Sequence, residues 1–284
     1  MIPTAIALGA MIAGTAAIVW GAETFAEHLA DASKRLGVTA FALALLLAGA
    51  EPEELATVVT ASARGVDGVA FGDVIGANAA IVTVALGVGA LVAALPFGRS
   101  IRRYALGGLA AGAIAATMMW DGRIDRAGGA VLVVGYIGFV ATIWLLERRP
   151  PSLGEAGELE EELDPHGRVG RDLVMVVVGL ASLTIGSIVL VEAVRRITDI
   201  EETQTRLGLT VVGFATAFEL VVLAWSSSRH GVSEAVVAGV IGSYAYNMTM
   251  SLGVGAIVAP IEISDAALLH GPLIAMLVLM LVAG

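Results

Sequence analysis

The sequence of 284 residues contains no cysteine and, apart from Lys34, no lysine. The absence of cysteine excludes disulfide bonds and thiolate chemistry. Charged residues are also scarce at 15%, whereas a soluble domain carries about 25%. The net charge of −10 argues against nucleic acid as a partner, because the phosphate backbone attracts basic proteins. Hydrophobic residues make up 57% of the chain and the mean hydropathy is +0.88, so the composition indicates a membrane protein.

Long uncharged stretches recur along the chain, and a helix needs only about 18 to 20 such residues to cross a bilayer. The first stretch lacks a basic region before it, so we interpret it as a span and not as a signal peptide. The pattern predicts an all-α membrane protein with nine visible spans. They are expected at about 3–26, 36–63, 69–95, 101–120, 127–147, 170–194, 205–228, 234–259 and 265–284.

A polar, strongly acidic segment at residues 148–169 divides the chain and is typical of a flexible linker. We expect five spans before it, in a first repeat at 1–147, and four after it, in a second repeat at 170–284. Either the symmetry is incomplete or a tenth span lies beyond Gly284. Arginine and lysine are more frequent in the loops that share a side with the linker, which predicts a cytoplasmic linker and an outside N-terminus.

Two glutamates lie inside membrane-length segments, 165 positions apart, in neighbourhoods that repeat. Glu54 lies in segment 49–65 and Glu219 in segment 214–230. A carboxylate at membrane depth is costly and marks a candidate functional site. The two residues fall in the second and seventh spans, so the second copy enters the membrane from the opposite side and the repeat is inverted. The pair predicts a cation site between two halves of a transporter. The expected motif helices are 36–63, 69–95, 205–228 and 234–259.

Oxygen-bearing side chains surround both glutamates at helical spacing. Glu51 shares a face with Glu54, as Thr216 does with Glu219. In the following helix Ser243 and Asn247 also share a face, and the pattern continues there with a slip of one residue. Pro52 is expected to kink the helix and free carbonyl oxygens. Carboxylate, carbonyl, hydroxyl and amide oxygens suit a hard cation such as Ca²⁺ or Na⁺.

Other polar residues have two interpretations. Glu53 points about 100° away from Glu54 on a helix and is expected to reach a loop or water. Asp73 is either a helix cap or a group that handles protons or ions. The chain's four histidines show no metal-ligand spacing: His28, His166, His230 and His270. Hydrolase and metalloprotease motifs are absent, so we do not expect an enzyme.

Two motifs are present in each half. Residues 49–55 read GAEPEEL and residues 214–220 read FATAFEL; residues 72–78 read GDVIGAN and residues 239–243 read GVIGS. Their order and inverted placement resemble the cation/calcium exchanger superfamily, whose members carry G-T-S-x-P-E-L-like and G-x-x-G-S-N-like motifs in two inverted repeats. This resemblance implies an inverted-repeat antiporter with five plus five helices, a midplane Ca²⁺ site formed by Glu54 and Glu219, and alternating access.

The chain departs from the family pattern at the positions that supply neutral oxygens. Ala50 and Glu51 stand where threonine and serine are usual, and Ala215 replaces the threonine of the second half, which keeps Thr216. These departures put sodium coupling in question, while neighbouring carboxylates can share a proton. The expected ligand and coupling residues are Glu54, Glu219, Glu51, Thr216, Ser243, Asn247, Ala50, Ala215 and Asp73.

The expected function is antiport of a divalent cation, Ca²⁺ first, coupled to H⁺ or Na⁺. Alternatives are exchange of Mg²⁺, K⁺ or a monovalent cation on the same scaffold, and a non-transporting protein with a decayed site. No cofactor is expected beyond the transported cation. The expected partners are inorganic cations and the lipid bilayer, for a monomer in the plasma membrane.

Overall fold

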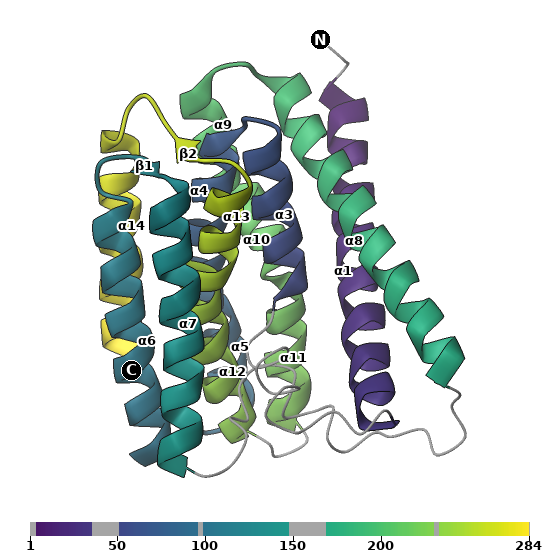
Figure 1. Ribbon diagram of the computed structural model, residues 1–284, viewed down its shortest axis with the longest axis vertical. Coiled ribbons are helices and arrows are strands. Elements are labelled where there is room, and N and C mark those ends of the chain that lie inside the picture. Colours follow the sequence, from purple (N-terminus) through teal and green to yellow (C-terminus); the bar gives the residue numbers. More distant parts are fainter. Residues whose placement is uncertain (1–3, 36–50, 96–98, 148–168, 230–232, 284) are drawn as a thin grey trace.

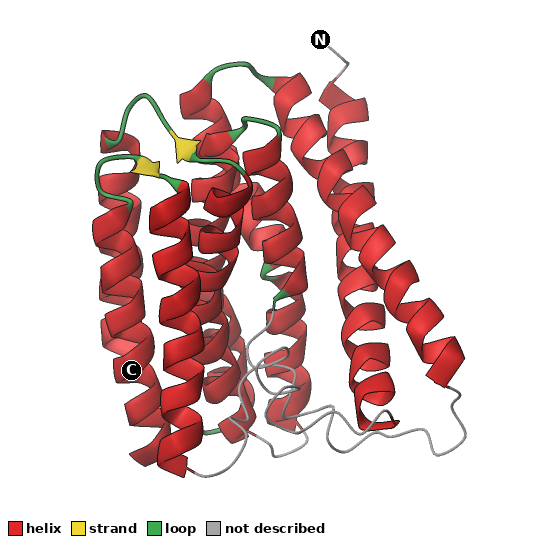
Figure 2. Ribbon diagram, in the orientation of Figure 1, coloured by secondary structure: helices red, strands yellow, loops and turns green. Residues whose placement is uncertain are grey.

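The computed structural model describes residues 4–35, 51–95, 99–147, 169–229 and 233–283, and nearly all of these are helical (Figure 2). Each of the nine predicted segments contains helix within the described residues. Five stretches are long and apolar enough to cross a membrane: Ala5–Leu29, Asp67–Val92, Arg126–Leu145, Val169–Ile197 and Glu201–Arg229. The linker at 148–168 and the residues 36–50 lie outside the described part.

The helices are labelled in Figure 1. The first half contains α1 (Thr4–Arg35), α3 (Pro52–Ala63), α4 (Asp67–Ala80), the π-helix η1 (Ile81–Ala85), α5 (Leu86–Val92), α6 (Arg99–Met118) and α7 (Arg126–Glu147). The second half contains α8 (Val169–Ile197), α9 (Glu201–Leu207), the π-helix η3 (Gly208–Val212), α10 (Gly213–Thr216), α11 (Phe218–Arg229), α12 (Ser233–Tyr246), the π-helix η4 (Asn247–Ser251), α13 (Leu252–Val258) and α14 (Ala267–Ala283).

Four consecutive elements of the first half recur in the second half with identical lengths. The series α3, α4, η1 and α5 corresponds to α11, α12, η4 and α13 at a constant shift of 166 residues. In Figure 1, α3 extends to one end of the bundle and α11 to the opposite end. The repeated segments therefore run in opposite directions, as the position of the two glutamates predicted.

Helices α1 and α8 lie antiparallel and make the most extensive helix–helix contact among the described elements (Figure 1). Glycines at the crossing allow this approach. A Cβ atom on Gly14 would lie 2.9 Å from the carbonyl oxygen of Gly186, and one on Gly21 would lie 2.8 Å from that of Gly179. Small residues let backbones approach closely in lipid, where packing drives association. The internal repeat relates these two contacts to each other, because Gly14 corresponds to Gly179 and Gly21 to Gly186.

Glycines of α4 pack against the segment that contains η3. A Cβ atom on Gly72 would lie 2.7 Å from the backbone nitrogen of Leu209, and one on Gly76 would collide with the carbonyl of the same residue. Both glycines lie inside α4, where they allow close helix packing.

Two boundaries differ from the predicted spans. The helix predicted at 3–26 continues to Arg35, and the one predicted at 205–228 is interrupted at Ala217, between α10 and α11. Pro52 was expected to kink a helix, but in the described residues it is the first residue of α3, a position where a missing N–H costs nothing. A short antiparallel pair, β1 (Arg123–Ile124) and β2 (Ile261–Glu262), joins loops at one end of the bundle and was not predicted.

Candidate cation site

Three glutamates meet at the beginning of α3. Glu51 is the residue before the helix, and Glu53 and Glu54 belong to its first turn. One carboxylate oxygen of each lies within 4.8 Å of those of the other two, and all three side chains are buried. The first turn of a helix favours negative charge, because its unpaired N–H groups carry partial positive charge. The beginning of α3 at Pro52 thus lies inside the protein together with three acidic side chains.

Glu53 is 1% exposed, so the expectation that it reaches a loop or water is wrong. Its position in the fold explains the burial, because α3 is enclosed by α4, α8 and α13 and has little free surface. The 100° turn between consecutive residues separates Glu53 from Glu54, yet both directions lead into the interior. Sequence periodicity could not identify this, since it assumes that a helix has one outward face.

Glu219 of the second half comes close to this group. It is the second residue of α11, as Glu53 is the second residue of α3. The charge of Glu219 lies within electrostatic range of both Glu53 and Glu54. The sequence aligned Glu219 with Glu54. By position in the helix its counterpart is Glu53, because the shift of 166 residues already applies to α3.

Asp73 adds a fifth carboxylate. It lies seven residues into α4, with α4 beginning at Asp67, so the alternative interpretation as a helix cap is wrong. Its side chain is fully buried, and its charge acts on Glu54. The hydroxyl of Thr216, at the end of α10, donates a hydrogen bond to Oδ1 of Asp73 over 3.0 Å. This contact joins the two halves of the protein beside the glutamates.

The helix α12 contributes a second contact between the halves. The hydroxyl of Ser243 donates a hydrogen bond to Oε1 of Glu51. Four residues later Asn247 begins η4, where its Oδ1 accepts from Ser251 over 3.5 Å and its Nδ2 atom has no hydrogen-bond partner among the described residues. Three π-helical turns flank the carboxylates in α4–α5, α9–α10 and α12–α13, and such turns are frequent at functional sites.

Several buried polar atoms of this region have no hydrogen-bond partner in the part of the chain that the structure describes. They are both carboxylate oxygens of Glu54, the hydroxyl of Thr57 and the side-chain amide atoms of Asn78. Unpaired buried polar groups are rare because each costs about 1–3 kcal/mol. Among the described residues, the charged groups that act on Glu53 and Glu54 are all acidic. The charge and the oxygen atoms both fit a cation as the missing partner.

Two tyrosines that sequence reasoning missed border the acidic group. Tyr136 of α7 and Tyr246 of α12 pack edge to face, with ring centroids 5.3 Å apart. Tyr246 lies within electrostatic range of all three glutamates of α3, and Tyr136 within range of Glu51. Nothing in the sequence around Tyr136 distinguishes it from a residue that packs in the membrane, so only its position in the fold identifies it.

The remaining predicted residues lie elsewhere. Ala50 is outside the described residues. Ala215 is half-buried and lines an apolar groove of about 820 Å³ between α1 and the segment 210–218, together with Phe214 and Phe218. The structure therefore brings together Glu51, Glu54, Asp73, Thr216, Glu219 and Ser243, adds Glu53, and places Asn247 on the same helix as Ser243.

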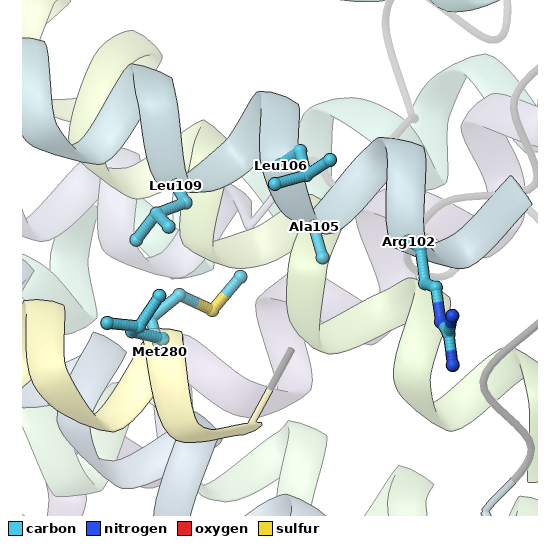
Figure 3. Close-up of a pocket in the computed structure, with 6 residues that line it drawn as sticks. Arg102, Ala105, Leu106, Leu109 and Met280 are labelled. Atoms are coloured by element: carbon cyan, nitrogen blue, oxygen red, sulfur yellow. The ribbon is translucent and has the colours of Figure 1, made fainter. Parts of the chain in front are cut away.

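A smaller pocket of about 170 Å³ lies between α6 and α14 (Figure 3). Leu106, Leu109 and Met280 form its wall, and Arg102 stands at one end. A pocket that offers apolar carbon and a basic group does not suit a cation, so the acidic group at α3 remains the candidate site.

Comparison with known proteins relates the chain to ion exchangers. The profile of the family described as sodium/calcium exchanger protein matches residues 6–145 and 172–284. CaxA of Alkalimonas amylolytica, which is named as a candidate antiporter, is 25% identical over 266 residues, covering 90% of this chain and 82% of that protein. The inner membrane protein YrbG of Escherichia coli (strain K12) is 23% identical over 278 residues, covering 92% and 83%.

Solved structures of the sodium-calcium exchanger NCX_Mj share the fold. One of them superposes with a TM-score of 0.59 at 21% identity and covers 99% of this chain and 91% of that one. Another, soaked with 0.1 mM Ca²⁺, has a TM-score of 0.58 at 20% identity, with coverage of 98% and 90%.

Proposed function

The chain belongs to the sodium/calcium exchanger protein family, and from this premise we propose that it exchanges Ca²⁺ for protons or Na⁺ by alternating access. Membership of this family makes the chain an integral, multi-pass membrane protein and a transporter, not a catalytic enzyme. Inorganic cations are the substrates that the family handles, and the acidic group at α3 is where this chain would bind them.

The observation that supports Ca²⁺ is the meeting of carboxylates from both halves inside the protein. Glu51, Glu53, Glu54 and Asp73 come from the first half and Glu219 from the second. Taking an ion out of water costs several kcal/mol, and a buried charge without a partner is strongly destabilising. Ca²⁺ takes six to eight oxygen ligands, which carboxylates, hydroxyls and amides supply. A divalent cation between the halves offsets this cost. As the halves move, the site opens to one side of the membrane at a time.

Charge balance favours protons as the exchanged ion. One Ca²⁺ neutralises two of the five carboxylates, so the others remain uncompensated unless they carry protons. When Ca²⁺ leaves, protons can neutralise the whole group. Glu51 is the coupling carboxylate in this proposal, because it stands where neutral oxygens are usual in the family and receives the hydrogen bond of Ser243. Exchange for Na⁺ remains the second candidate, since Thr216 and Ser243 retain hydroxyl oxygens at the site.

The membrane arrangement follows the same proposal. All nine helical segments cross the plasma membrane, five from repeat 1–147 and four from repeat 170–284, around a cytoplasmic linker at 148–169. The N-terminus lies outside, because the loops on the linker side contain more arginine and lysine. The protein acts as a monomer, with both halves of its site supplied by one chain.

The decisive experiment measures ⁴⁵Ca²⁺ movement in liposomes that contain the purified protein. An imposed pH gradient is expected to drive Ca²⁺ uptake, and an imposed Na⁺ gradient of equal size is expected to drive less. Uptake that is driven by the Na⁺ gradient and not by the pH gradient would show that Na⁺ is the coupling ion in place of H⁺. No Ca²⁺ movement under either gradient would contradict Ca²⁺ antiport.

Competition separates the alternatives in the same vesicles. Mg²⁺ or K⁺ that suppresses Ca²⁺ uptake and is itself carried would identify a different cargo on the same scaffold. If the purified protein binds no cation at all, the site has decayed and the proposal fails. The four buried carboxylates, Glu51, Glu53, Glu54 and Asp73, argue against decay, because a protein that no longer binds cations would gain stability by losing them.

A further inference from the structure

A second group of ligating side chains lies far from the acidic site, between α1 and α8. His28 and Asp31 are three residues apart on α1, so they share one face of the helix. Asp172 stands in the first turn of α8, on the neighbouring helix. One nitrogen or oxygen atom of each side chain lies within 4.8 Å of those of the other two. The antiparallel arrangement of α1 and α8 brings these residues together although 143 others separate His28 from Asp172 (Figure 1).

All three residues are buried. The exposed fractions are 9% for His28, 6% for Asp31 and 2% for Asp172. Nδ1 of His28 lies 3.4 Å from Oδ1 of Asp172, but it makes no hydrogen bond to any described residue. A buried imidazole nitrogen therefore lies at ion-pair distance from Asp172 without a hydrogen bond to a described residue. Buried polar groups of this kind are normally paired, so the geometry indicates that a further atom belongs between them.

The inverted repeat separates this group from the transport site. Helices α1 and α8 correspond at a shift of 165 residues, as their contacting glycines show. The counterparts of His28, Asp31 and Asp172 are Ala193, Arg196 and Ala7, none of which can ligate a cation. The group therefore has no symmetry-related copy, although its own three residues come from both halves, His28 and Asp31 from α1 and Asp172 from α8.

We propose that His28, Asp31 and Asp172 bind a divalent transition-metal ion that joins α1 to α8. One imidazole nitrogen and two carboxylate oxygens are ligands that Zn²⁺, Co²⁺ and Mn²⁺ accept, whereas Ca²⁺ prefers oxygen alone. Zn–N and Zn–O bonds of about 2.0–2.1 Å put two ligands of a tetrahedral ion roughly 3.3–3.4 Å apart. The 3.4 Å between His28 and Asp172 matches that edge.

The test uses Co²⁺ as the probe, because its visible spectrum reports nitrogen and oxygen ligation. The full chain is purified in detergent with Glu53, Glu54 and Glu219 changed to glutamine, which removes most of the acidic site. Co²⁺ is expected to bind this protein at one site and to raise its unfolding temperature. Adding His28→Gln or Asp172→Asn is expected to weaken Co²⁺ binding by about 100-fold or more, since even supporting contacts of metal ligands are worth 10–100-fold.

Two controls keep the outcome unambiguous. Asp199→Asn changes an aspartate beyond the other end of α8 and is expected to leave Co²⁺ binding unchanged. In the protein with an intact acidic site, a 100-fold excess of Ca²⁺ is expected to leave the His28-dependent spectrum in place. This second measurement does not depend on whether a variant folds. Equal Co²⁺ binding with and without His28, or complete displacement by Ca²⁺, overturns the proposal and leaves His28 as an ion-pair partner only.

Discussion

At the level of single residues, the carboxylates of the acidic site differ in what surrounds them. Glu51 receives a hydrogen bond from Ser243 and Asp73 one from Thr216, whereas neither oxygen of Glu54 has a hydrogen-bond partner among the described residues. Glu53 lies within electrostatic range of Glu219 of the other half. We infer that Glu53, Glu54 and Glu219 hold the cation directly and that Glu51 and Asp73 adjust the charge around it.

Glu53→Gln is expected to weaken Ca²⁺ transport as much as Glu54→Gln does. Each change removes one negative charge beside a divalent ion, and at an effective dielectric of about 20 such an attraction amounts to several kcal/mol. We expect the Ca²⁺ concentration at half-maximal ⁴⁵Ca²⁺ uptake to rise on the order of 100-fold. Glu202→Gln, at an exposed residue paired with Arg206, is the control and should behave like the unmodified protein. Normal uptake by Glu53→Gln would show that Glu54, and not Glu53, binds Ca²⁺ together with Glu219.

Thr216→Val tests the hydroxyl that joins the two halves. The change keeps the shape of the side chain and removes the donor to Asp73. A hydrogen bond to a charged group contributes about 1.5–3 kcal/mol, so Ca²⁺ uptake is expected to need about tenfold more Ca²⁺. Thr216→Ser should restore it. Thr210→Val removes a hydroxyl that bonds only to the backbone of its own helix and should change nothing. Unchanged Ca²⁺ uptake by the Thr216→Val protein would show that this hydrogen bond does not contribute to Ca²⁺ binding.

At the level of elements, close packing between glycines holds the helices together. The chain could be divided into helices from its sequence, because the apolar runs are long and each is bounded by polar residues. Their mutual positions could not be predicted. Gly21 and Gly179 read as ordinary small residues until α1 and α8 are placed side by side.

Gly21→Ala is expected to destabilise the protein through α1 and α8. Its Cβ atom would lie 2.7 Å from the backbone nitrogen of Leu183, which cannot move aside as a flexible side chain can. Overpacking of this kind costs about 1–3 kcal/mol, or several degrees of unfolding temperature for a chain of this size. Gly9→Ala, in the same helix with nothing within 4 Å, is the matched control. Thermal unfolding in detergent measures both, and equal temperatures would contradict the close crossing.

At the level of the whole molecule, the repeat makes the two ends of the bundle comparable. Arg64 of the loop after α3 pairs with Glu192 of α8 over 3.4 Å. The sequence alignment of the repeat, at 165 residues and not at the 166 by which α3 and α11 correspond, relates them to Arg229 and Glu27. These two form no ion pair with each other in the described structure, where Arg229 lies over the ring of Trp225. One end of the bundle thus has an ion pair that the aligned residues at the other end do not form, an asymmetry that fits the proposed alternation between two states.

Cross-linking tests this asymmetry, and the absence of native cysteine makes introduced thiols unique. A short bifunctional thiol reagent is expected to join Arg64→Cys to Glu192→Cys and to stop Ca²⁺ transport. The pair Arg229→Cys and Glu27→Cys is expected to react only in the opposite state, so blocking one pair should lower the reactivity of the other. Simultaneous cross-linking of both pairs in one molecule, with transport intact, would show that neither pair reports the state.

The sequence by itself determined the membrane class, the helical segments, the repeat and its inversion, and the presence of acid at membrane depth. Hydropathy and charge are properties of each residue and its near neighbours, so they can be read without a structure. Only the tertiary structure decided which side chains meet: Ser243 with Glu51, Thr216 with Asp73, and His28 with Asp172. These contacts depend on where helices cross and on single-residue shifts between the halves. Both are set by packing between distant segments, which no local pattern records.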